Sequence, residues 1–133
     1  MPSIIVLDTL SPDGLALLDA AAATGITYEV CTGLSGDALR QALASHDGAI
    51  CRSGVKITAD ALAGNHRLKA IVRAGVGTDN IDKDAATRQG IVVMNTPAGN
   101  TVSTAEHAFA LILALSRNLS LIHISEPTRP RLI

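Results

Sequence analysis

The chain has 133 residues, which is enough for one packed domain and too few for two full ones. It is 47% hydrophobic but only 2% aromatic, so its core must consist of alanine, valine, isoleucine and leucine. Eleven basic and 12 acidic residues give a net charge of -1, which excludes a chain-wide attraction to nucleic acid or anionic lipid. Any anion site must therefore be local.

Membrane, secretory and metal classes are also disfavoured. The longest apolar stretch, residues 108–115, falls short of the roughly 20 residues that span a bilayer, and the apolar run at 4–7 lacks the basic start of a signal peptide. Cys31 and Cys51 show no CxxC spacing. We therefore expect a cytoplasmic protein with no nucleic-acid or membrane partner.

Short β-branched runs alternate along the chain with amphipathic or alanine-rich stretches. In chain order this pattern predicts a strand at 4–7, a helix at 11–23, a strand at 27–31, a helix at 35–43, a strand at 48–51, a helix at 58–63, a strand at 68–73, a helix at 81–89, a strand at 91–94 and a long helix at 101–117. Strands joined through helices predict an α/β fold with a flavodoxin-like, doubly wound parallel five-stranded sheet in the order 2-1-3-4-5.

Ligands of such sheets bind at the carboxyl ends of the strands. The loop after the third strand carries Arg52, Ser53 and Gly54, and a guanidinium beside a hydroxyl and an accessible amide suits a carboxylate or phosphate. An ordinary turn with a surface arginine explains the same residues equally well.

The loop after the fourth strand begins a GxGxxG dinucleotide fingerprint but does not finish it. Asn80 stands where the third glycine should be, and no acidic residue follows at the spacing that ribose recognition requires. We interpret residues 79–82 as a helix cap. Gly75 and Gly77 permit a tight loop whose amides face a ligand, and a simple turn remains the alternative.

The long helix follows a polar turn at 95–100, and its first amides are a potential anion site. Ser103 and Glu106 have capping-box spacing. Apolar residues lie on nearly every side of this helix, so we expect a missing domain or subunit to cover it. Histidines 46, 66 and 123 lack metal-ligand spacing and are predicted at the surface, and His107 is predicted to pack in the helix.

Three ordered segments, 52–58, 71–82 and 90–107, closely resemble the D-2-hydroxyacid dehydrogenases. The resemblance spans about residues 4–120 and is closest to the branch that oxidises 3-phosphoglycerate at the start of serine biosynthesis. It implies that residues 1–100 are a substrate-binding (catalytic) domain and that 101–120 lead to a nucleotide-binding Rossmann domain that this chain lacks.

The same resemblance implies roles for individual residues. The substrate, a small anionic 2-hydroxy or 2-oxo acid, would contact Arg52, Ser53, Gly54, Arg73 and Asn100. The NAD cofactor would lie near Val76, Gly77 and Thr104. The family's catalytic arginine, glutamate and histidine and its GxGxxG loop lie downstream, so we predict that this chain contains no catalytic residue and is inactive alone. We also expect the full-length protein to be a homo-oligomer.

Three points remain open at this stage. A sibling reductase for glyoxylate or hydroxypyruvate, or a formate dehydrogenase, would not need Arg73. A non-enzymatic flavodoxin-like module, such as a receiver domain, would need an acidic cluster, an aspartate and a lysine where the chain has Asp8, Arg52 and Asn95. Residues 121–133 fit no family pattern, and we predict a disordered tail of foreign coding sequence.

Overall fold

The computed structural model describes residues 1–117 and contains every predicted strand and helix within that range. The elements in chain order are β1 (Ser3–Val6), α1 (Pro12–Ala22), β2 (Thr27–Val30), α2 (Gly36–Ser45), β3 (Gly48–Cys51), α3 (Ala59–Leu62), β4 (Ala70–Arg73), α4 (Lys83–Arg88), β5 (Val92–Asn95) and α5 (Thr101–Ser116). The predicted tail at 121–133 and His123 lie outside the described residues.

Two element starts lie two residues later than predicted, for identifiable reasons, and the other starts differ by one residue at most. β4 begins later because the side chain of Asn65 accepts the N–H groups of Arg67 and Leu68, at 3.0 and 2.9 Å, and holds those residues in a turn. α4 begins later because the carboxylate of Asp82 caps it by accepting the Ala85 N–H at 2.9 Å.

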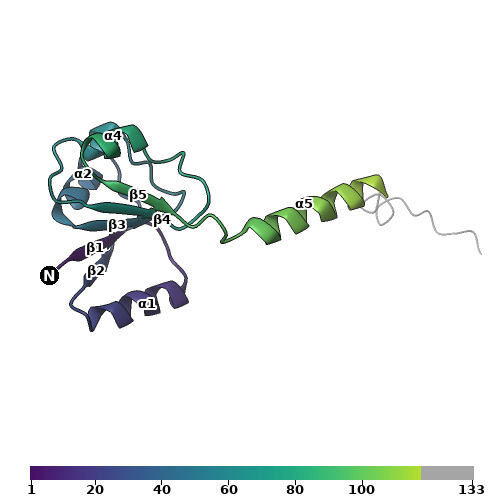
Figure 1. The fold of residues 1–133 in the computed structure, drawn as a ribbon, viewed down its shortest axis with the longest axis horizontal. Coiled ribbons are helices and arrows are strands. Elements are labelled where there is room, and N and C mark those ends of the chain that lie inside the picture. Colours follow the sequence, from purple (N-terminus) through teal and green to yellow (C-terminus); the bar gives the residue numbers. More distant parts are fainter. Residues whose placement is uncertain (118–133) are drawn as a thin grey trace, which may run out of the picture. The chain divides into compact units, whose positions relative to one another are not determined.

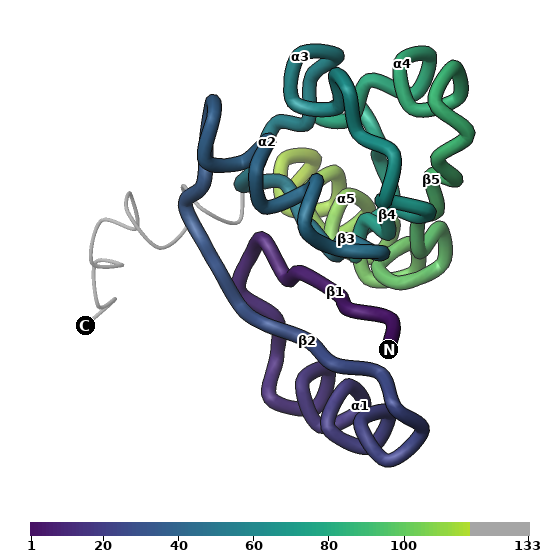
Figure 2. Tube along the Cα trace, turned by 90° about the vertical axis from the view of Figure 1, so that its left-hand side faces the viewer, coloured from purple at the N-terminus to yellow at the C-terminus, as the bar shows by residue number. Residues whose placement is uncertain are grey.

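The five strands form one sheet in the order β2-β1-β3-β4-β5, and every neighbouring pair is parallel. This confirms the predicted α/β topology. Figures 1 and 2 show α1 on one face of the sheet and α2, α3 and α4 on the other. The loops that follow β1, β3, β4 and β5 therefore leave the sheet side by side at its carboxyl edge.

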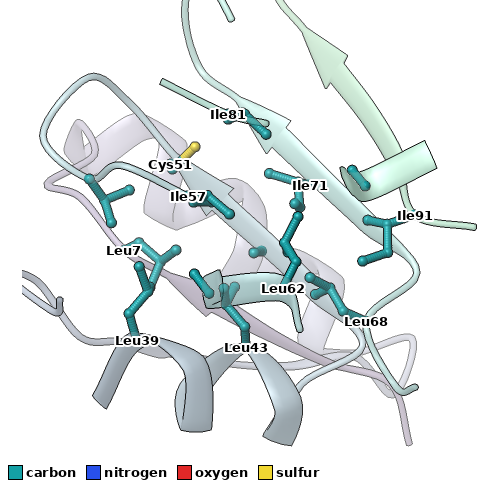
Figure 3. Packing of buried hydrophobic residues seen from close by; sticks show 14 of the residues in the cluster. Leu7, Leu39, Leu43, Cys51, Ile57, Leu62, Leu68, Ile71, Ile81 and Ile91 are labelled. Atoms are coloured by element: carbon teal, nitrogen blue, oxygen red, sulfur yellow. The ribbon is translucent and has the colours of Figure 1, made fainter. Parts of the chain in front are cut away.

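The hydrophobic core lies between the sheet and the face that α2, α3 and α4 cover. Leu39 and Leu43 of α2 meet Leu62 of α3 over the strands, and all three are at most 2% exposed (Figure 3). Helix α1 buries none of its residues on the opposite face. Most of the hydrophobic burial that stabilises the fold is therefore on the face of the sheet that α2, α3 and α4 cover.

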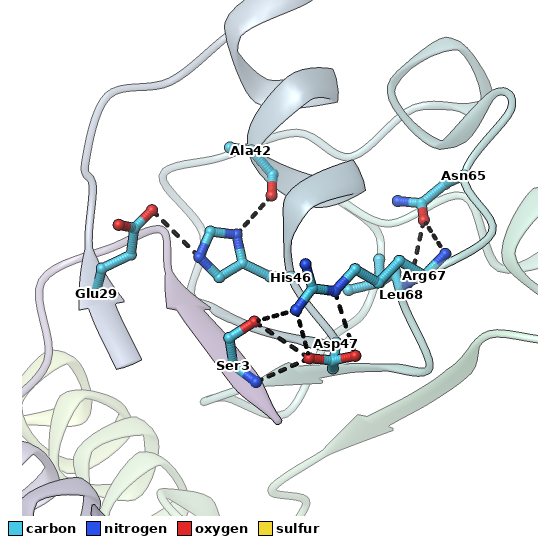
Figure 4. A network of polar contacts seen from close by, with 8 residues as sticks. All are labelled: Ser3, Glu29, Ala42, His46, Asp47, Asn65, Arg67 and Leu68. Atoms are coloured by element: carbon cyan, nitrogen blue, oxygen red, sulfur yellow. Dashed lines mark hydrogen bonds and ion pairs between the residues drawn. The ribbon is translucent and has the colours of Figure 1, made fainter. Parts of the chain in front are cut away.

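A polar network closes the amino-terminal edge of the sheet (Figure 4). Asp47, just before β3, accepts the Ser3 N–H at 2.8 Å and the Arg67 guanidinium at 3.1 Å. Hydrogen bonds from Arg67, then from the Ser3 amide, hold the pKa of the Asp47 carboxyl well below its usual range. The network joins the starts of three strands, at the end of the sheet opposite to the predicted site.

His46 belongs to the same region, and its predicted surface position is wrong. Its side chain is 11% exposed, Nδ1 lies 2.7 Å from the Ala42 carbonyl oxygen, and Nε2 lies 3.2 Å from Glu29 (Figure 4). A histidine that ends a helix can turn its ring back onto the last carbonyls. His66 is exposed, as predicted.

Residues 1–99 form one compact unit, and α5 belongs to a second that begins at Asn100. The predicted capping box in α5 is wrong, because Asn100 is the N-cap and Ser103 lies inside the first turn, where its hydroxyl donates to the Asn100 carbonyl at 3.1 Å. α5 buries none of its side chains, His107 included, so the packing role of His107 is not found. Cover by a further domain or subunit stays a prediction.

Candidate functional site

The loop after β3 is linked to the loop after β1. The carboxylate of Asp8 accepts the Arg52 N–H at 2.6 Å, and the Arg52 guanidinium donates to the Thr9 carbonyl at 3.3 Å. These contacts join residues more than 40 positions apart because β1 and β3 are neighbours in the sheet. They hold an exposed cation at the carboxyl edge.

Position 54 is a glycine for a structural reason that the sequence alone did not reveal. A Cβ at this position would lie 2.2 Å from the Asp8 Oδ1 atom, far inside the closest contact that real side chains make. The glycine therefore allows the loop to pass beside the same carboxylate that holds the Arg52 amide. Ser53, between the two, is exposed.

Asn80 links the β3 loop to the chain that follows β4. Its Nδ2 atom donates to the carbonyl oxygens of Arg52 and Val55, each at 2.8 Å. An isolated parallel bridge between Ile57 and Ile81 continues this pairing directly beyond the loop. Asn80 thus contacts both ends of the Arg52–Val55 loop. The helix cap predicted at residues 79–82 is confirmed at Asp82, which caps α4, and the side chain of Asn80 has this separate role.

Arg73 is surrounded by its own loop. Its Nη1 atom donates to the Gly77 carbonyl, and its Nε atom is buried with no hydrogen-bond partner in the described part of the chain. A Cβ at Gly75 would lie 3.5 Å from the guanidinium, and one at Gly77 would lie 2.9 Å from both Arg73 and Asp79. A Cβ at Gly75 would be in ordinary contact, whereas the glycine at position 77 makes room for the side chains of Arg73 and Asp79.

The end of β5 holds the other side of this loop. The Asn95 side chain donates to the Val76 carbonyl at 2.6 Å, and the Thr96 N–H donates to the Gly75 carbonyl at 3.1 Å. Val76 itself is 42% exposed. Hydrogen bonds therefore run continuously across the carboxyl edge from the β1 loop to the end of β5.

Cys51 lies beneath these loops as the last residue of β3. Its side chain is fully buried, and burial, followed by the nearby Asp8 charge, raises the pKa of the thiol to about 11. The Arg73 charge and a hydrogen bond with Asn80 oppose that increase only in part. A thiol that stays protonated at neutral pH is a packing group and not a nucleophile.

A pocket of about 450 Å³ lies beside Gly54 and Val55 and is completed by the start of α2. Its charged residues are two cations and two acids, namely Arg40, Lys56, Asp37 and Asp60. This balance does not favour an anion. The cations that could bind an anion, Arg52 and Arg73, lie at the carboxyl ends of β3 and β4.

Six of the eight residues predicted to bind ligand lie at the linked edge, in the β3 and β4 loops: Arg52, Ser53, Gly54, Arg73, Val76 and Gly77. Asn100 and Thr104 belong to the second unit, so their roles stay predictions. Asp8, Asn80 and Asn95 were missed as supporting residues. The predicted strand order brings their loops to the same edge, but their contacts depend on loop conformation, which the sequence did not provide.

Within residues 1–117, no three histidine, cysteine, aspartate or glutamate side chains gather as metal ligands would. No helix in that range is both long enough and apolar enough to cross a bilayer.

Comparisons with known proteins place this geometry in context. The model of the family described as D-isomer specific 2-hydroxyacid dehydrogenase, catalytic domain, matches residues 4–124. A D-3-phosphoglycerate dehydrogenase of Archaeoglobus fulgidus is 42% identical over 116 residues, which cover 87% of this chain but only 21% of that protein.

Two solved structures have the same fold. A protein of Pyrococcus horikoshii matches with a TM-score of 0.81 and 29% identity over 95% of this chain and 38% of its own. The NAD+-bound 3-phosphoglycerate dehydrogenase of Entamoeba histolytica matches with a TM-score of 0.73 and 27% identity over 85% of this chain and 38% of its own.

Proposed function

The chain belongs to the D-isomer specific 2-hydroxyacid dehydrogenase family, and we propose that it is the substrate-binding part of an NAD-dependent D-3-phosphoglycerate dehydrogenase that acts in serine biosynthesis. The names of its relatives support the substrate. Because the chain spans 21% of the Archaeoglobus relative, turnover belongs to a longer protein in this proposal. A cytoplasmic location and a homo-oligomeric full-length form remain predictions.

One observation carries the proposal: Arg52 is exposed at the carboxyl edge while its backbone is held on both sides, by Asp8 and Asn80. A guanidinium held in place suits a carboxylate, which it can bind through two parallel hydrogen bonds. In this proposal Arg52, Ser53 and Gly54 bind the carboxylate end of the substrate. As the family resemblance implies, Arg73 would bind its phosphate. Asn100 belongs to the second unit, and its contact with the substrate remains a prediction.

NAD needs a separate test of fit. The Arg73–Asn80 loop does not suit a dinucleotide pyrophosphate. The side chains of Arg73 and Asp79 occupy the space beside Gly77, and the side chain of Asn80 is hydrogen-bonded to the β3 loop. We therefore assign no step of hydride transfer to residues of this chain. Val76, Gly77 and Thr104 remain proposed neighbours of the cofactor in a complete enzyme.

Titration of the 133-residue chain with 3-phosphoglycerate, followed by NMR, tests the proposal. We expect saturable shifts of the Ser53 and Gly54 amides, and a loss of about tenfold in affinity in Arg52→Gln, because a charged hydrogen bond is removed. Arg40→Gln removes an equal charge from α2 and is the matched control. Equal affinities in the two variants would contradict the assignment.

A second candidate is a sibling enzyme for glyoxylate, hydroxypyruvate or formate. It is favoured by the engagement of Arg73 with the Gly77 carbonyl, because that contact occupies the cation that a phosphate would need. Arg73→Gln separates the two: it should weaken phosphoglycerate binding and leave glyoxylate binding unchanged. Family membership counts against the third candidate, a receiver-like binding module.

A further inference from the structure

The Arg52–Val55 loop is held by residues from two other loops, and neither of them has a role in the proposed binding of substrate. We propose that Asp8 and Asn80 are positioning residues, which together hold this loop in the conformation that presents Arg52, Ser53 and Gly54 to the substrate. The proposal rests on the proposed function for the identity of the ligand and on the loop geometry for the rest.

Asn80 fixes the span of the loop. Its single Nδ2 group carries two protons, and these meet the carbonyl oxygens of the first and last loop residues, Arg52 and Val55, each at 2.8 Å. Val55 is also 5% exposed and part of the core. The Val55 end of the loop is therefore held by packing in the core, and Asn80 fixes the position of the Arg52 end relative to it.

Asp8 acts on the same loop from the β1 side. Its Oδ2 atom accepts the Arg52 N–H at 2.6 Å, and its Oδ1 atom occupies the space beside Gly54. Arg52 is thus held through its N–H by Asp8 and through its carbonyl by Asn80. The N–H and the carbonyl of one residue are thus held by side chains from the loops that follow two different strands, β1 and β4.

These contacts use the backbone of the loop and leave its side chains available. Ser53 is exposed, and within residues 1–117 the Arg52 guanidinium makes one hydrogen bond, to the Thr9 carbonyl at 3.3 Å. Substrate would therefore find the guanidinium in place and lose less side-chain and loop entropy on binding. Asp8 and Asn80 support the site without touching the ligand.

The opposite edge of the sheet offers a matched control. Asp47 also accepts a backbone N–H, from Ser3 at 2.8 Å, and also joins neighbouring strands. Its network lies at the amino ends of the strands, away from the loop. Asp47→Ala therefore removes a comparable set of hydrogen bonds and reports the effect of lost stability alone.

The experiment uses the 133-residue chain and 3-phosphoglycerate as the probe. Affinity is measured by calorimetry, and order of the loop is measured by 15N relaxation of the amides of residues 52–55, in wild type, Asn80→Ala, Asp8→Ala, Asp8→Asn and Asp47→Ala. Asp8→Ala and Asp8→Asn both lose the charge, but only Asp8→Asn keeps an acceptor oxygen for the Arg52 N–H.

We expect Asn80→Ala and Asp8→Ala to disorder the loop and to weaken phosphoglycerate binding by about fivefold to tenfold, whereas Asp8→Asn and Asp47→Ala stay within about twofold of wild type. Unchanged loop relaxation in Asn80→Ala and Asp8→Ala overturns the proposal, and so does a loss of affinity in Asp47→Ala as large as theirs. A wild-type chain that binds no phosphoglycerate contradicts the proposed function instead, and relaxation of the loop then decides separately whether Asp8 and Asn80 hold it.

Discussion

Replacing Gly54 with alanine brings a methyl group against the Asp8 carboxylate. The new Cβ would lie 2.2 Å from Oδ1, so the carboxylate must move by about 1 Å to reach an ordinary contact. That movement breaks the 2.6 Å hydrogen bond from the Arg52 N–H. A charge-assisted bond is worth about 1.5–3 kcal/mol, and we take the lower value because this one is exposed to solvent.

A second term acts in the opposite direction. Gly54 does not have the positive φ that would strain alanine, so the substitution also restricts the unfolded chain and stabilises by about 0.5 kcal/mol. Gly54→Ala should therefore destabilise wild type by about 1 kcal/mol. In an Asp8→Ala background the methyl group meets no carboxylate, and the same substitution should stabilise by about 0.5 kcal/mol.

Urea unfolding of the four chains, followed by circular dichroism, completes this double-mutant cycle. The expected coupling between positions 8 and 54 is about 1.5 kcal/mol, the sum of the loss in one background and the gain in the other. If Gly54→Ala has the same effect in both backgrounds, Asp8 is not the reason for the glycine and the reasoning is refuted.

Three further predictions concern the core, the amino-terminal edge and the buried thiol. Leu43 is fully buried, so Leu43→Ala should cost about 3 kcal/mol in urea unfolding, and a loss below about 1 kcal/mol would contradict its place in the core. The Arg67 hydrogen bond lowers the pKa of Asp47 below 3.8 in the folded chain, so ionised Asp47 stabilises the fold fully above pH 3.8, and this stabilisation is lost as the pH falls below it. Asp47→Asn should therefore flatten the acid dependence of the urea midpoint. An unaltered dependence would exclude Asp47 as its source. With a pKa of about 11 and no exposure, Cys51 should resist iodoacetamide until urea unfolds the chain, as read by peptide mass spectrometry, and rapid native labelling would disprove its burial.

The sheet could be predicted from the sequence because its signals are local. Runs such as 4–7 and 91–94 are apolar and rich in β-branched residues, and the right-handed crossover rule then leaves few strand orders. The position of Arg52, Ser53 and Gly54 at the carboxyl edge followed from the same reasoning. No contact between distant residues was needed for either result.

The supporting residues could not be predicted, because their partners are distant in the sequence. Asn80 lies next to Asp82 before a short helix, which is how a capping residue is arranged, yet its amide reaches carbonyls 25 and 28 positions earlier. Asp8 similarly contacts a residue 44 positions later. Both contacts depend on the conformation of the loops and the orientation of their side chains, which the predicted strand order does not provide.

The interpretation of glycines failed for a related reason. A glycine in a loop is compatible with a positive φ, with a ligand close to its amide, or with a neighbouring side chain that leaves no room for Cβ. Gly54 and Gly77 belong to the third class, and their neighbours are Asp8 and Arg73. The sequence shows that these positions have no side chain, but it does not show which atom occupies the space that a Cβ would take.

The shared space between Asp8 and Gly54 restricts how this protein family can diverge. A lineage that gains any side chain at position 54 while it keeps the acid at position 8 would pass through a strained intermediate, because the new Cβ and the Asp8 carboxylate would overlap. Loss of the acid first removes that barrier. Substitutions at the two positions should therefore occur together among homologues, with the change at position 8 as the earlier event.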